Sequence, residues 1–283
     1  MRIGGVPEHF NLPWRLAIEE GIFSSKGIEL EWTDYPGGTG AMNKALREGE
    51  LDIATILTEG IVADIINGNP SQILKIHVQT PLNWGIFVNQ SSAFQQVDDL
   101  RAARFAISRL GSGSQLMAYV NALQRGWNLT DLSMVVLNNL EGMRKGLRDN
   151  EADAFMWERV MTQPYVDSSE LRRVGICPTP WPGFVLVARN EVIANESEKL
   201  QLICDLFNKF VSSFKQRPGL DELIAQRYLL PLADVQQWIA ETEWATTNNI
   251  EISMLENVMG TLQKAGTITR KIPATELITT FKD

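Results

Sequence analysis

Segments typical of strands and of helices alternate along the first half of this 283-residue chain. Residues 52–57 form a continuous apolar run, as in a buried parallel strand, and residues 28–33 alternate apolar and polar side chains. This order predicts an α/β fold whose parallel strands are joined by right-handed helical crossovers. The expected strands cover residues 2–6, 28–33, 52–57, 84–89, 104–108, 133–137, 153–157 and 184–188.

Helices are expected between these strands and after residue 190. Asn11 can cap the first helix, with Pro13 at an early position where its missing N–H costs little. Gly37–Gly40 opens the second helix and Gly49 ends it. The C-terminal part reads as helix only, with Leu200, Cys204, Phe207, Val211 and Phe214 on one long apolar face, followed by helices around residues 221–228, 233–242 and 253–264.

A short internal repeat suggests two related halves. Residues 44–52 (KALREGELD) align with residues 145–153 (KGLRDNEAD), 101 positions later. Gly49 and Asn150 occupy the same place in the repeat, and both tolerate the left-handed conformation that ends helices. We therefore expect a first lobe built from residues 1–87 and 187–283 and a second lobe from residues 88–186. The strands at 84–89 and 184–188 would pass between the lobes and form a two-strand hinge.

Composition narrows the class of protein. The net charge of −8 argues against a nucleic-acid partner, and no stretch reaches the ~20 apolar residues that a membrane helix needs. Two histidines are too few for a multi-histidine metal site, so neither a metal nor another cofactor is expected. Cys177 and Cys204 fit no metal or redox spacing; two buried thiols are the preferred interpretation and one disulfide the alternative.

The first residues, Met1 to Val6, lead directly into a strand and lack the charged and apolar regions of an export signal. The expected location is the cytoplasm if Met1 is the native start, and the periplasm if a leader has been removed.

Several motifs resemble type 2 periplasmic binding proteins when their order and spacing are taken together. They are GVPE at 5–8, AIEEGIF at 17–23, GIELE at 27–31, GGTG at 37–40, GELDIA at 49–54, SRLGSGS at 108–114 and MWE at 156–158. The nearest branches are the nitrate/sulfonate/taurine (SsuA-like) proteins and the binders of thiamine-pyrimidine precursors. The resemblance, which covers roughly residues 3–190, implies two α/β lobes that close on a small ligand, usually for delivery to an ABC importer.

Ligands of open α/β sheets bind beyond the carboxyl ends of the strands, so the loops there supply the candidate residues. After the first strand come Glu8, His9, Phe10 and Asn11, of which His9 offers one hydrogen bond near neutral pH. An ordinary surface loop is the alternative. Thr58 and Glu59 follow the strand at 52–57, and Glu59 could balance an amino group or simply favour a helix N-terminus.

Two glycine-rich turns are expected to hold an anion at helix N-termini that face each other across a shared crevice. Gly38 and Thr39 belong to the first turn; the second contributes Arg109, Ser112, Gly113 and Ser114. Neither is a phosphate loop, because no Gly-Lys-Ser/Thr sequence follows. Each turn by itself could also be only a tight connection.

Aromatic side chains complete the predicted pocket. Trp157 and Glu158 follow a strand of the second half, and the resemblance implies that they lie near the ligand. Trp84 and Trp181 stand at strand ends or in loops, and Trp181 lies in a rigid Pro-Trp-Pro-Gly turn. Aromatic walls with few polar groups suit an organic molecule better than bare nitrate. Core packing is the alternative for each tryptophan.

The sequence favours a small-molecule binding protein that closes by hinge motion over an anionic or aromatic heterocyclic ligand, without catalysis. The expected partners are that ligand and, for an importer component, an ABC permease; the protein is expected to be a monomer. The alternative is an enzyme on the same scaffold, of the thiamine-pyrimidine or menaquinone-pathway type, although the cysteine-rich segment of the pyrimidine synthases is missing. A transcriptional effector domain is a third reading.

Overall fold

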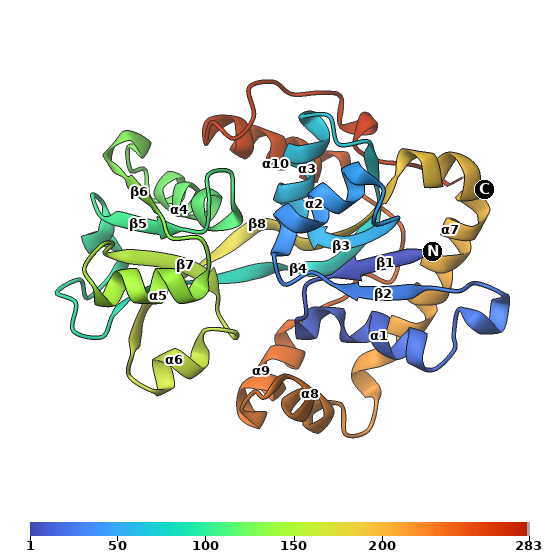
Figure 1. Ribbon diagram of the computed structural model, residues 1–283, viewed down its shortest axis with the longest axis horizontal. Coiled ribbons are helices and arrows are strands. Elements are labelled where there is room, and N and C mark those ends of the chain that lie inside the picture. The colour runs from blue at the N-terminus through green and yellow to red at the C-terminus, as the bar shows by residue number, and fades with distance from the viewer. Residues whose placement is uncertain (282–283) are drawn as a thin grey trace. The chain divides into compact units, whose positions relative to one another are not determined.

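The computed structural model describes residues 1–281 and divides the chain into two compact units (Figure 1). Unit 1 comprises Met1–Thr80, Trp181–Gly260 and the described part of Arg270–Asp283. Unit 2 comprises Pro81–Pro180 and Thr261–Thr269. Each unit is an α/β structure, as the alternating pattern predicts.

Unit 1 is built on three parallel strands and one antiparallel strand. Strand β1 (Arg2–Gly5) pairs in parallel with β2 (Glu31–Asp34) and with β3 (Ile53–Leu57). Residues Phe184–Ala188 of β8 pair antiparallel with β3. Helix α1 (Leu12–Glu19) lies on one side of these strands, and α2 (Gly38–Glu48) and α3 (Thr58–Ile66) lie on the other (Figure 1). The apolar run at 52–57 is the buried strand that was expected.

Unit 2 repeats this plan. Strand β5 (Arg104–Ile107) pairs in parallel with β6 (Ser133–Val136) and with β7 (Ala154–Glu158), and Trp84–Val88 of β4 pairs antiparallel with β7. The connecting helices are α4 (Gly113–Gln124), α5 (Leu140–Arg148) and the short α6 (Gln163–Asp167).

Two strands of 19 residues, β4 (Ser71–Asn89) and β8 (Leu171–Arg189), run from one unit into the other (Figure 1). The sequence pattern predicted only their second halves, at 84–89 and 184–188. The full length of β8 is harder to recognise from the sequence because this strand contains three prolines, which donate no ladder hydrogen bond. The chain passes between units at 80/81, 180/181, 260/261 and 269/270; the sequence led us to expect boundaries at 87/88 and 186/187.

Hydrogen bonds join all eight strands into one series, β2-β1-β3-β8-β4-β7-β5-β6, rather than two separate sheets. The long strands β8 and β4 are neighbours in the series, and each is antiparallel to its other neighbour, β3 and β7 respectively.

The sequence repeat corresponds to the same local structure in both units. The Arg2 backbone N–H donates to Asp52 Oδ2 at 2.9 Å, and the Arg104 N–H donates to Asp153 Oδ2 at 2.7 Å. In each case the arginine side chain also forms an ion pair with that aspartate. Gly49 and Asn150 have φ angles of 74° and 58°, so both adopt the predicted left-handed conformation.

The remaining helices follow β8. They are α7 (Asn190–Val211), α8 (Leu220–Tyr228), α9 (Leu232–Glu241) and α10 (Ile252–Lys264). Short 3-10 turns lie at His9–Asn11, Ser24–Lys26, Val97–Leu100, Leu129–Asp131, Phe214–Gln216 and Ala274–Glu276. Cys177 and Cys204 are buried free thiols, as preferred from the sequence, and burial raises the pKa of each to about 12.

Candidate functional site

The topology of unit 1 gathers its predicted ligand residues at one edge of its strands, where the parallel strands end. We call this the carboxyl edge of unit 1. β1 is followed there by Glu8, His9, Phe10 and Asn11, β2 by the turn that contains Gly38 and Thr39, and β3 by Thr58 and Glu59. Trp181 lies at the same edge, because it comes just before Phe184–Ala188, the part of β8 that pairs antiparallel with β3.

Glu59 is the buried acid of this edge, with 1% of its surface exposed. Its Oε2 accepts a hydrogen bond from the Trp181 indole Nε1 at 2.8 Å, whereas its Oε1 is buried without a partner among the described residues. Burial raises the pKa of Glu59 to about 7. The neighbouring Thr58 hydroxyl donates to the Pro182 carbonyl at 2.6 Å. The Pro-Trp-Pro-Gly segment was expected to be a turn, but it is extended and belongs to β8, where this hydrogen bond fastens it to the start of α3.

Helices α2 and α3 start side by side at this edge. An added Cβ on Gly60 would lie 2.4 Å from Thr39 Cγ2, so only glycine allows this approach without displacement. The Asn43 amide donates to the Gly60 carbonyl at 3.3 Å. The first glycine turn opens a helix as predicted, and Gly38 adopts a φ of 66° at its first position.

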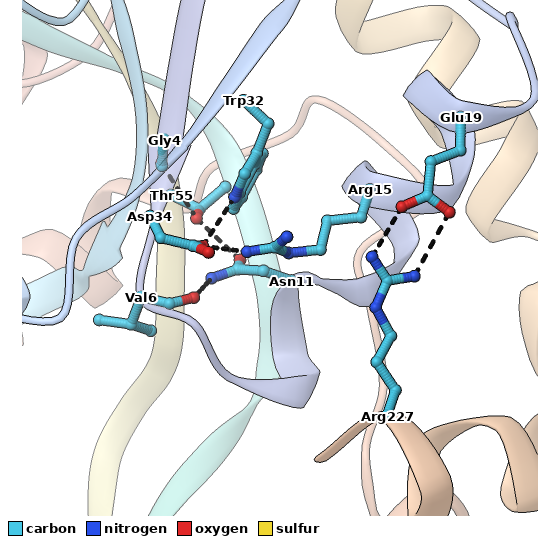
Figure 2. A network of polar contacts seen from close by, with 9 residues as sticks. All are labelled: Gly4, Val6, Asn11, Arg15, Glu19, Trp32, Asp34, Thr55 and Arg227. Atoms are coloured by element: carbon cyan, nitrogen blue, oxygen red, sulfur yellow. Dashed lines mark hydrogen bonds and ion pairs between the residues drawn. The ribbon is translucent and has the colours of Figure 1, made fainter.

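Asn11 has a structural role different from the one expected (Figure 2). It stands at the start of α1, but its side chain caps no helix N–H. Its Nδ2 donates to the Val6 carbonyl at 2.9 Å, and its Oδ1 accepts from the Thr55 hydroxyl at 2.8 Å. The capping prediction was wrong because Thr55, a buried residue of β3, offers the side chain a long-range partner.

His9 lies inside unit 1 in contact with aromatic rings. The His9 ring centroid is 4.1 Å from that of Trp238 and 5.9 Å from that of Tyr228. Burial lowers the pKa of His9 to about 3, so its imidazole is neutral near pH 7. Both of its nitrogens are buried without a hydrogen-bond partner among residues 1–281. The adjacent Phe10 is buried as well, and its carbonyl accepts from the Trp244 indole at 3.0 Å.

Three residues of unit 1 that the sequence did not single out form a polar group at the end of β2 (Figure 2). Asp34 accepts from the Trp32 indole at 3.0 Å and pairs with Arg15, whose guanidinium lies 5.3 Å from the Trp32 ring centroid. Nothing in the sequence around Arg15 indicates this contact, because its partner Asp34 comes 19 residues later.

In unit 2, the residues after β5 form a compact serine turn at the start of α4. The Ser112 hydroxyl caps the helix by accepting from the Gln115 N–H at 3.3 Å, and Ser114 Oγ accepts from the Ser108 N–H at 3.0 Å. The two hydroxyls, of Ser112 and Ser114, lie 2.9 Å apart. Gly113 is the first residue of α4, and Arg109 is exposed. The hydroxyls of Ser112 and Ser114, which were predicted to bind an anion, thus also form hydrogen bonds that stabilise their own turn.

Trp84, Trp157 and Glu158 meet where β4 and β7 pair. Trp84 is opposite Glu158 in the register, and the rings of Trp84 and Trp157 contact edge to face with centroids 6.5 Å apart. Trp84 is 6% exposed, and its indole nitrogen is buried with no partner in the described chain. Glu158 Oε2 accepts from the Met161 N–H at 2.7 Å, and burial raises the pKa of Glu158 to about 7.

Within residues 1–281, no group of three or more His, Cys, Asp or Glu side chains is arranged to hold a metal ion. No helix in that part of the chain has the length and apolar character to span a membrane.

Comparisons with known proteins identify the fold. Residues 84–177, which lie within unit 2, match the family model of Ca3427-like periplasmic binding proteins. The Candida albicans CA3427 gene product, described as defining a family with the generic periplasmic binding protein fold, is 23% identical, with a TM-score of 0.89 over 99% of this chain and 95% of that one. A search of curated protein sequences finds no match.

Two sulfonate-binding proteins share the fold at lower identity. The alkanesulfonate-binding protein SsuA from Xanthomonas axonopodis pv. citri, bound to MOPS, is 16% identical with a TM-score of 0.82, over 98% of this chain and 97% of that one. The periplasmic aliphatic sulphonate binding protein SsuA from Escherichia coli is 15% identical with a TM-score of 0.75, over 100% and 92%. The predicted resemblance and fold class are therefore confirmed: the chain has the periplasmic binding protein fold, and its residues 84–177 match the Ca3427-like family.

Proposed function

We propose that this chain is a small-molecule binding protein that takes up one small organic ligand through residues at the strand ends of its two units, and that it closes by a hinge motion of β4 and β8. The main proposed contacts are Glu59 and Trp181 in unit 1 and Trp84 and Trp157 in unit 2. The other residues predicted from the sequence, including the serine turn of α4, would contribute the remaining polar contacts.

The observation that carries this proposal is that buried polar atoms of the predicted site residues lack partners within the described chain, the two His9 nitrogens among them. Glu59 Oε1 in unit 1 and Trp84 Nε1 in unit 2 both belong to residues that the strand-end argument selected from the sequence. An unsatisfied buried polar atom costs about 1–3 kcal/mol, and native proteins leave few of them. A donor presented to Glu59 Oε1 would remove the cost in unit 1, and an acceptor presented to Trp84 Nε1 would remove the cost in unit 2.

The solved neighbours support a binding role on the same fold. Their names describe proteins that bind alkanesulfonates, one of them with MOPS bound. Two ligand classes follow for this chain, a sulfonate at the N-terminus of α4 and an aromatic heterocycle between tryptophans. We further propose that the protein acts as a monomer, and that a role in import would require an ABC permease and a periplasmic location.

An enzyme on this scaffold is the second candidate. Glu59 and Glu158 each have a pKa raised to about 7, which suits a general acid or base near neutral pH. Turnover of a pyrimidine or of a chorismate-derived substrate would favour this candidate over the binding role.

The proposed function is tested on the purified full chain. Native mass spectrometry should show a bound small molecule, and titration of the ligand-free protein with that molecule should raise the melting temperature and quench tryptophan fluorescence without forming product. Trp84→Phe, which keeps an aromatic ring but removes the indole N–H, should weaken binding about tenfold. Equal affinity in wild type and Trp84→Phe would remove Trp84 from the site, and product formation would replace the binding role with an enzymatic one.

A further inference from the structure

Helices α8 and α9 of unit 1, which we call the α8–α9 hairpin (residues 220–241), cover His9 and leave polar atoms unpaired on both sides of the contact. The ring centroid of Trp238 in α9 lies 4.1 Å from that of His9, and the centroid of Tyr228 at the end of α8 lies 5.9 Å from it. The two His9 nitrogens, the Tyr228 hydroxyl and the Trp238 indole nitrogen are all buried without a hydrogen-bond partner among the described residues.

These unpaired atoms cost the closed hairpin free energy, since they have lost their hydrogen bonds to water and gained none from the protein. Native proteins leave few buried polar atoms in this state, so several of them in one contact need an explanation. A neutral imidazole offers one N–H and one lone pair, a phenol both donates and accepts, and an indole only donates. Water satisfies all of them, but only when the hairpin no longer shields His9.

The hairpin is closed at its base and held together along its length. Lys215 Nζ, just before α8, donates to the Thr242 carbonyl at 3.0 Å and to the Glu243 carboxylate at 2.7 Å, just after α9. The Gln236 amide of α9 donates to Asp221 Oδ2 of α8 at 2.7 Å. The two helices can therefore move together as one body.

The polar ties between this hairpin and α1 are weak ones. Arg227 of α8 pairs with Glu19 at 2.7 Å (Figure 2), and Arg217, which precedes the hairpin, pairs with Glu20. All four side chains are at least 30% exposed, and exposed ion pairs contribute little to stability. Leu229, at the tip between the helices, is 88% exposed, so the tip adds little apolar contact.

We infer that the α8–α9 hairpin is a cover that opens locally in the folded protein and separates Tyr228 and Trp238 from His9, so that water reaches the polar atoms of all three. Their hydration offsets part of the packing that is lost on opening, which makes the hairpin a low-stability part of unit 1. Opening also uncovers the ring nitrogens of His9 at the carboxyl edge of unit 1. The inference concerns the ligand-free protein and does not depend on the proposed binding function.

The chain has two histidines, His9 and His77, so modification of imidazole by diethyl pyrocarbonate reports on each of them. Both are fully buried, but His77 belongs to β4 and its Nε2 is hydrogen-bonded to the Phe10 carbonyl at 3.2 Å. Peptide mass spectrometry of the modified full chain gives both rates. We expect His9 to react about tenfold faster than His77 or more, and hydrogen exchange to show residues 220–241 opening at a lower free energy than β3.

Tyr228→Phe tests the cost of the unpaired atoms, because it removes the buried hydroxyl and keeps the ring. The closed hairpin of this variant buries one unpaired group fewer, so His9 should react about fivefold more slowly than in the wild type. Glu19→Gln removes an ion pair to α8 and should speed the reaction about two- to fivefold. Glu48→Gln, a change of an exposed acid on α2, is the matched control and should leave both histidine rates unchanged. Circular dichroism verifies that each variant is folded.

Two results would contradict the inference. If His9 and His77 react at the same rate in the wild type, then His9 becomes accessible only when the core of unit 1 unfolds, and the hairpin is no separate cover. If Tyr228→Phe leaves His9 equally reactive or makes it more reactive, then the unpaired hydroxyl does not promote opening. Both measurements are made without a ligand, so neither result decides whether the binding function is correct.

Discussion

Burial sets the protonation of the ionisable residues at the strand ends. Glu59 and Glu158 are buried acids whose pKa values are raised to about 7, and His9 is a buried base whose pKa is lowered to about 3. All three environments disfavour charge. The acids therefore destabilise the fold when the pH is high enough to ionise them, and His9 does so when the pH is low enough to protonate it.

Glu158→Gln should make the stability of the protein less dependent on pH. Because the pKa of Glu158 is raised from 4.5 to about 7, its ionisation costs the folded state stability as the pH rises through this interval. The loss is about 3 kcal/mol at most, from a shift of roughly two and a half pH units at 1.36 kcal/mol each. Urea unfolding at pH 5 and pH 8 should show the variant close to the wild type at pH 5 and more stable at pH 8.

The exposed Glu48→Gln serves as the control for this measurement and should follow the wild-type stability at both pH values. If Glu158→Gln lost as much stability as the wild type between pH 5 and pH 8, then the Glu158 carboxyl would not be the titrating group. The pKa of Glu59 is raised in the same direction, so the stability of the double variant Glu59→Gln/Glu158→Gln should depend on pH even less.

At the scale of helices, α2 and α3 are held together by a close approach of their first turns and by an ion pair between Arg47 and Asp64. The approach depends on the absence of a Cβ at Gly60, which faces the methyl group of Thr39. This contact also fixes the two helix starts at the carboxyl edge of unit 1, and thus the position of Glu59 relative to the first glycine turn.

Gly60→Ala should destabilise the protein by about 1–3 kcal/mol, as expected for overpacking. Its Cβ would lie 2.4 Å from Thr39 Cγ2, so Thr39→Ser, which removes that methyl group, should recover most of the loss in the double variant. A double-mutant cycle by urea unfolding measures this coupling. Purely additive effects would show that Thr39 is not what Gly60 accommodates.

The helix caps of the internal repeat make a matched pair of positions. Asn150 adopts a φ of 58°, so Asn150→Ala should cost about 1 kcal/mol, whereas Asn150→Gly should cost less, since glycine accepts this conformation freely. Gly49→Ala should be at least as costly, since its Cβ would also lie 3.0 Å from Arg189 Nη1. Urea unfolding of the three variants provides the comparison. Equal free energies of unfolding for Asn150→Ala and Asn150→Gly would contradict the role of the left-handed cap.

At the scale of the whole molecule, local rules were enough to predict much of the fold. The left-handed caps at Gly49 and Asn150 followed from residue type and repeat position alone. The parallel strands β3 and β5 followed from apolar runs bounded by turns. These features depend on neighbours a few residues away, so a single sequence contains the information.

Features that depend on distant partners escaped prediction. Asn11 caps nothing because its Oδ1 accepts a hydrogen bond at 2.8 Å from the hydroxyl of Thr55, 44 residues later. His9 is enclosed by Tyr228 and Trp238, which come more than 200 residues later, so a ligand-facing loop could not be told from a buried one. The orphaned oxygen of Glu59 depends on the bond from Trp181, and only the folded chain reveals it.

The pairing of β3 with β8 has a consequence for biosynthesis. On a ribosome, Ile53–Leu57 emerges long before Phe184–Ala188, and nearly all of unit 2 is made in the interval. The nascent chain thus carries an open, apolar strand edge while its second unit is already able to fold. Protection of that edge during synthesis, by a chaperone or by rapid translation, is a requirement that this chain order imposes.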